Sequence, residues 1–141
     1  MSVLMPLTLH LAVALGVYIV AASLGMLFTP AARVDRLYAE LADSPGLILA
    51  YGVIAFAIGA AWLMVHQEWI TPLGIIVSIA GWIFAAEGVL MLAAPALMVR
   101  LAAVFRPILR PACIVAILLG ALLVFAGLTG QADAVAYTTQ V

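Results

Sequence analysis

The stretch 70–94 reads ITPLGIIVSIAGWIFAAEGVLMLAA and contains a single ionisable side chain, Glu87. A helix rises 1.5 Å per residue, so about 20 residues cross the roughly 30 Å hydrocarbon layer of a bilayer. The stretch is therefore long enough and apolar enough to predict a transmembrane helix. Three further apolar runs have a similar length: Leu7–Phe28, Gly46–Val65 and Pro111–Thr129.

The composition of the 141 residues agrees with four such helices. Hydrophobic residues make up 69% of the chain, charged residues only 8%, and the mean hydropathy is +1.36, whereas about a quarter of an average soluble domain is charged. These values exclude a soluble globular protein and predict an all-α integral membrane protein. A net charge of -1 without lysine argues against a nucleic-acid partner, and a single cysteine excludes an internal disulfide framework.

All five basic residues fall in two of the connections between the predicted helices. They are Arg33 and Arg36 in the first connection and Arg100, Arg106 and Arg110 in the third. Loops rich in arginine stay in the cytoplasm, and in a four-helix chain these two loops share one side. We therefore expect a multi-pass membrane protein with both termini periplasmic or extracellular.

Both arginine-bearing connections are predicted to be short helices. The first is expected to begin with Thr29 as its cap and Pro30 at its first position. Its apolar stripe, Val34, Leu37, Tyr38 and Leu41, opposes its charged residues. This pattern is typical of an amphipathic helix lying in the membrane interface. The segment 95–106 repeats the pattern.

An offset of 65 residues aligns two halves of the chain. Pro30 then matches Pro95 and opens a similar amphipathic segment, and Gly16 matches Gly81. We interpret residues 1–141 as one membrane domain, with one repeat in 1–66, a second in 67–130 and a short outer tail in 131–141. Each repeat would be a helix, an interfacial helix and a helix; because each spans the membrane twice, the two repeats would be parallel.

The second half carries Glu87-Gly88, a proline eight residues after the glutamate, an arginine-bearing linker and a last helix that contains Gly120. In these features it resembles the small YjeT-like inner-membrane proteins, which are two-helix hairpins of unknown function. The first half resembles the same pattern but has Ala22-Ser23 in place of Glu-Gly. The resemblance implies a tandem duplication of that hairpin, located in the bacterial inner membrane, and implies no reaction.

Glu87 is the one ionisable side chain inside a predicted span, and such residues are costly and commonly functional. One interpretation is a structural carboxylate that is protonated or paired with Arg33 or Arg100. The other is a proton or cation site. We favour the structural interpretation.

Two other patterns concern metal binding and helix packing. His10, His66 and Glu68 are all expected near the outer boundary, but their spacing lacks two histidines at i and i+4, so we expect interface polarity and no metal. The third span carries small residues at four- and three-residue steps, which predicts a seam for close helix packing. The seam consists of Gly74, Ser78, Gly81, Ala85 and Gly88.

No positioned nucleophile and base stand out in the sequence, so we expect a non-enzymatic protein without a cofactor. The preferred function is an accessory or scaffold protein whose partners are the lipid bilayer and another membrane protein or a second copy. The alternative is a small oligomeric transporter or channel that moves protons or cations through Glu87.

Overall fold

The computed structural model describes residues 4–130, and every element in that range is helical. The four long helices are apolar and long enough to cross a membrane, which confirms the predicted all-α membrane fold. The predicted tail 131–141 lies outside the described residues. The elements in chain order are α1 (Leu4–Phe28), α2 (Ala31–Asp43), α3 (Pro45–Val65), α4 (Pro72–Ala93), α5 (Pro95–Phe105), the 3-10 turn η1 (Arg106–Ile108) and α6 (Leu109–Thr129).

Prolines mark where most of these helices begin. Pro45, Pro72 and Pro95 lie in the first turns of α3, α4 and α5, where a missing backbone N–H costs nothing. The expected cap of α2 was wrong: Pro30 is the capping residue, and no side chain caps the helix. The Thr29 hydroxyl instead donates a hydrogen bond to the carbonyl of Gly25, because the last carbonyls of α1 have no partner of their own in the helix.

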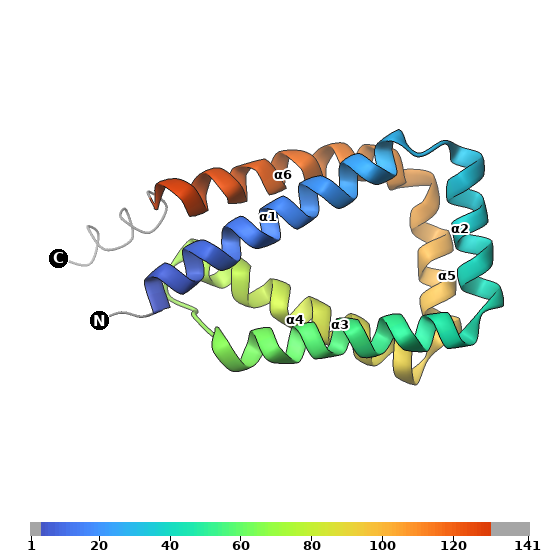
Figure 1. Cartoon of the computed structure of the whole chain (residues 1–141), viewed down its shortest axis with the longest axis horizontal. Coiled ribbons are helices and arrows are strands. Elements are labelled where there is room, and N and C mark those ends of the chain that lie inside the picture. Colours follow the sequence, from blue (N-terminus) through green and yellow to red (C-terminus); the bar gives the residue numbers. More distant parts are fainter. Residues whose placement is uncertain (1–3, 131–141) are drawn as a thin grey trace.

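The long helices associate as two pairs, α1 with α6 and α3 with α4 (Figure 1). The pairs approach each other mainly through α1 and α4, at the end of the molecule that holds the turn 66–71, which we call the turn end. They diverge toward the other end, where α2 and α5 lie side by side and where the arginines of α2, α5, η1 and the start of α6 are found. We call this the arginine end.

Glycines allow the helices of each pair to approach closely. A β-carbon added to Gly16 would lie 2.6 Å from the Gly120 carbonyl oxygen, and one added to Gly59 would collide with the backbone of Ala85. Close approach gives extensive van der Waals contact, which holds helices together where lipid provides no hydrophobic driving force. The first helix of the chain is therefore joined tightly to the last, and the two middle helices are joined to each other.

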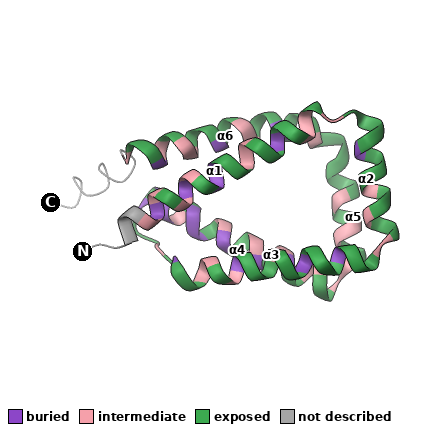
Figure 2. Cartoon of the chain, in the orientation of Figure 1, coloured by how far each residue is buried: buried purple, intermediate pink, exposed green. Residues whose placement is uncertain are grey.

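Burial is confined to the lines along which helices touch (Figure 2). A small apolar core of Ala12, Leu73 and Val77 lies at the turn end, where α1 meets α4. Many large apolar side chains elsewhere are exposed, including Leu118 and Phe125 on α6. This pattern fits helices whose outer faces contact lipid chains.

Candidate functional site

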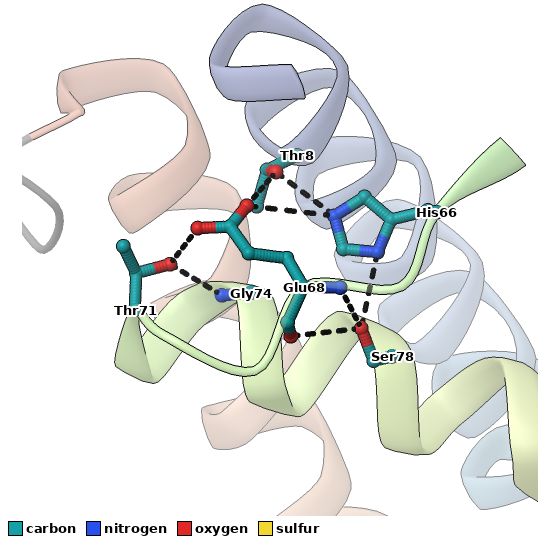
Figure 3. Close-up of polar contacts among 6 residues, drawn as sticks. All are labelled: Thr8, His66, Glu68, Thr71, Gly74 and Ser78. Carbon is teal, nitrogen blue, oxygen red and sulfur yellow. Dashed lines mark hydrogen bonds and ion pairs between the residues drawn. The ribbon is translucent and has the colours of Figure 1, made fainter. Parts of the chain in front are cut away.

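Five polar side chains from three segments meet at the turn end (Figure 3). We call them the polar cluster: Thr8 of α1, His66, Glu68 and Thr71 of the turn, and Ser78 of α4. His66 is only 1% exposed, and Thr8, Thr71 and Ser78 are equally buried. Because each segment contributes at least one partner, the cluster joins α1 to the α3–α4 pair.

Thr8 and Glu68 make the connection across the helices. The Thr8 hydroxyl donates to Glu68 Oε2 at 2.8 Å and lies 2.8 Å from His66 Nε2. The other carboxylate oxygen of Glu68 accepts from the Thr71 hydroxyl at 2.8 Å. Thr71 in turn accepts from the backbone N–H of Gly74 and caps α4. The carboxylate therefore holds both α1 and the first turn of α4.

Ser78 completes the cluster from the opposite side of the imidazole. Its hydroxyl oxygen accepts from the backbone N–H of Glu68 at 2.9 Å, lies 3.0 Å from the carbonyl oxygen of Glu68 and lies 3.2 Å from His66 Nδ1. A hydroxyl that is fully buried and committed to these contacts is not positioned to attack a substrate. Ser78 therefore acts structurally, as a bridge from α4 to the turn.

The cluster has more contacts than protons when His66 is neutral and Glu68 is a carboxylate. Four contacts join the hydroxyls of Thr8 and Ser78 to His66 and Glu68. Each hydroxyl supplies one proton and neutral imidazole supplies one, so three protons serve four contacts. A fourth proton would complete the network.

The protonation of His66 is opposed by its surroundings. Burial lowers the pKa of His66 below its usual 6.5, and this effect exceeds the attraction of Glu68, whose Oε2 lies 3.9 Å from Nε2, and that of a backbone hydrogen bond. Burial has this direction because it removes the water that would solvate the imidazolium. His66 is thus neutral around pH 7.

The weak metal hypothesis involved His10, His66 and Glu68. The structure brings His66 and Glu68 together, but the α1 residue that reaches them is Thr8, whereas His10 is exposed. Two residues along a helix rotate by about 200°, so Thr8 and His10 point in nearly opposite directions. Within the described part of the chain, no group of three His, Cys, Asp or Glu side chains is placed to hold a metal ion.

Glu87 lies half-buried on α4, and within residues 7–130 its carboxyl group has no hydrogen bond or ion pair. Its expected partners Arg33 and Arg100 are both exposed, and neither is paired with it. The arginine end instead has an ion pair between Arg106 and Asp35, which joins η1 to α2. The role predicted for Glu87 stays a prediction.

The predicted small-residue seam of α4 faces two different neighbours. Gly81 packs against Trp62, Ala85 against Gly59, and Gly88 against Phe56, so this part of the seam contacts α3. Gly74 packs instead against Glu68 and Thr71, and Ser78 belongs to the polar cluster. All five seam residues, Gly74, Ser78, Gly81, Ala85 and Gly88, are buried.

Where the two helix pairs begin to diverge, the structure contains an apolar cavity of about 670 Å³. Side chains of α1, α4 and α6 line it, among them Leu15, Ile79 and Leu122. Tyr18 and Phe84 lie on its wall, and their rings pack edge to face with centres 5.9 Å apart. The ring of Phe84 also stacks on that of Trp62, with centres 6.2 Å apart. Such a cavity suits a hydrocarbon chain or an apolar side chain.

Comparisons of the chain with protein-family models, with curated proteins and with solved structures found no match.

Proposed function

We propose that this protein is a small non-enzymatic accessory or scaffold protein that associates with a transmembrane helix of another membrane protein. The observation that carries this proposal is an exposed face of small residues on α1. This face consists of Ala14, Ala21 and Gly25, which recur at seven and four residues and so lie on one side of the helix. We call it the α1 small face.

The small face of α1 differs from the other small-residue faces of the chain. The other long helices bury the glycines of their middle turns within the helix pairs, as Gly59 of α3 is buried against Ala85 of α4 and Gly120 of α6 against Gly16 of α1. By contrast, nothing lies within 4 Å of a β-carbon added to Gly25. Helices associate in lipid through small residues that let backbones approach. A partner helix can therefore pack here as α6 packs against Gly16.

The pairing of the long helices also supports the proposed duplication into parallel repeats. In the proposed repeats α1 corresponds to α4 and α3 corresponds to α6, so the α1–α6 pair corresponds to the α4–α3 pair. Both pairs are closely packed through glycines. Together with the shared prolines at 30 and 95, this pairing supports a tandem of YjeT-like hairpins. We further propose the bacterial inner membrane as its location, with the arginine end in the cytoplasm, because the two arginine-bearing connections lie at one end.

Enlarging the small face tests the association. In Gly25→Leu the new side chain would cover the face, and its β-carbon would lie in open space. Gly46→Leu is a matched control, because Gly46 is also a helical glycine with open space around it and lies in the first turn of α3. The full chain would be purified from membranes in mild detergent, and the bound membrane proteins quantified by mass spectrometry.

We expect the same partner to be recovered with the unchanged chain and with Gly46→Leu, and to be lost with Gly25→Leu. Cross-linking from a photoreactive residue at Ala21 would identify the partner helix. Equal recovery with both variants would contradict the proposal, and a cross-link to a second copy alone would replace the external partner by self-association.

A second candidate function rests on Glu87, whose half-buried carboxyl group has no hydrogen bond or ion pair within residues 7–130. An unpaired acid within a span costs about 3 kcal/mol when ionised, unless water or a partner reaches it. A proton or cation transporter would use this group. The test is flux into proteoliposomes, which Glu87→Gln should abolish if transport occurs. We expect no flux from the unchanged chain.

A further inference from the structure

A second cavity, of about 270 Å³, opens at the arginine end, where α1 ends, α2 begins and η1 leads into α6. Its walls combine apolar side chains with charged ones, including Met26, Leu109, Asp35, Arg106 and Arg110. Its volume lies at the lower limit of ordinary ligand pockets, which suits a small group such as a lipid headgroup. None of these residues belongs to the α1 small face, so the inference is independent of the proposed association.

The charges around this cavity do not cancel. Asp35 is paired with Arg106, and this ion pair bridges the cavity wall from α2 to η1. Arg110, one turn further along, has no hydrogen bond or ion pair within residues 7–130. Among the described residues that line the cavity, two are arginines and one is an aspartate. The net charge of these three side chains is positive, and the guanidinium N–H groups of Arg110 remain available to a ligand.

The charged cavity lies at the ends of two apolar helices, where the proposed spans meet the membrane boundary. The apolar helix α1 ends here at Phe28, and the apolar helix α6 begins here at Leu109. The amphipathic helix α2 starts on the same wall. A ligand in this place would have an anionic group at the arginines and an apolar part along Met26 and Leu109.

We propose that this cavity binds the phosphate of an anionic membrane lipid, with Arg110 as its main contact and Arg106 as a second. Guanidinium groups bind phosphate oxygens through two parallel hydrogen bonds, and basic pockets between transmembrane helices are suited to anionic headgroups. The lipid chains would then follow the apolar wall into the bilayer. The mixed lining favours a lipid over free phosphate, because inorganic phosphate has no apolar part to place against Met26 and Leu109.

The test measures lipid retained by the full chain in a neutral detergent, using native mass spectrometry with equimolar phosphatidylglycerol and phosphatidylcholine. We expect selective retention of phosphatidylglycerol. Arg110→Gln should reduce it at least about tenfold, since a hydrogen bond to a charged group contributes about 1.5 to 3 kcal/mol. Arg100→Gln is the matched control, because Arg100 is an exposed arginine of α5 that does not line the cavity. It should retain the lipid.

Asp35→Asn provides a variant that tests the same site in the opposite direction. It removes the one negative charge of the cavity and releases Arg106, so retention of phosphatidylglycerol should increase. An excess of inorganic phosphate should leave the bound lipid in place. Circular dichroism would confirm that each variant keeps its helical content.

Three results would overturn the proposal. One is equal retention of phosphatidylcholine, and another is an equal loss in Arg100→Gln and Arg110→Gln. The third is displacement of the lipid by inorganic phosphate, which would assign the cavity to the free anion.

Discussion

The turn end and the arginine end both contain charged or titratable side chains, but they use them in opposite ways. At the turn end, His66 and Glu68 lie in a network with Thr8 and Ser78 that is almost closed to solvent. At the arginine end, Asp35 and Arg106 are each about half exposed. Buried groups whose bonds are committed to the fold stabilise it, whereas exposed and partly unpaired groups remain able to bind something else.

The comparison predicts the largest loss of stability from His66→Ala. The substitution removes a fully buried side chain and leaves Thr8 and Ser78 without their shared partner, which should cost about 2 to 5 kcal/mol. Thermal unfolding in detergent, followed by circular dichroism, would measure the loss. His10→Ala, at an exposed position outside the polar cluster, should cost clearly less. Equal effects would show that the polar cluster does not stabilise the fold.

Thr8→Val should have the next largest effect. Valine keeps nearly the same shape but removes the hydroxyl that contacts both His66 and Glu68, at a cost of about 1 to 3 kcal/mol. Because α1 and α4 touch mainly at this end, the distance between them should also increase. Spin labels at Leu11 and Ile76 would report it. An unchanged distance would mean that the apolar core of Ala12, Leu73 and Val77 is sufficient to hold the pairs together.

A smaller effect is expected from pH. The folded-state pKa of His66 is depressed by burial, so the unfolded chain takes up a proton before the folded chain does. Stability should therefore be constant above about pH 7 and should fall as the pH drops through 6.5 toward the folded-state pKa. His66→Gln should abolish this dependence. Increased stability on acidification would show that the fourth proton of the polar cluster outweighs the cost of burying charge.

The smallest effect is expected from Asp35→Asn. Its ion pair with Arg106 is about half exposed, and such pairs contribute about 0 to 1 kcal/mol in water and less at high salt. The same thermal measurement at low and high salt would show a small difference that disappears as salt is added. A loss as large as that of Thr8→Val would remove the distinction between the two ends.

The sequence predicted the elements well because hydrophobic length and proline positions act locally. The runs that begin at Gly46 and Pro111 became helices that begin at Pro45 and Leu109. The pairing of α1 with α6 could not be predicted, since every long helix is apolar on all sides and no polar face marks the partner.

The candidate sites were predicted only in part for a similar reason. The turn supplied His66 and Glu68 as expected, but the choice between Thr8 and His10 depends on how α1 is rotated about its axis, which a uniformly apolar helix does not reveal. The one available signal was that Thr8 and Ser78 are among the few polar residues of their largely apolar spans. The pair Asp35–Arg106 joins segments far apart in sequence, and its formation follows from the packing of α2 beside α5.

The pairing of the first helix with the last has a consequence for how the chain is made. The neighbours α3 and α4 can pack as soon as both have left the ribosome, but α1 must wait for α6, whose end lies about a hundred residues after its own. At about 5 to 20 residues per second, that delay lasts roughly 5 to 20 seconds. During that interval the face of α1 around Gly16, which α6 covers in the folded chain, has no partner from α6.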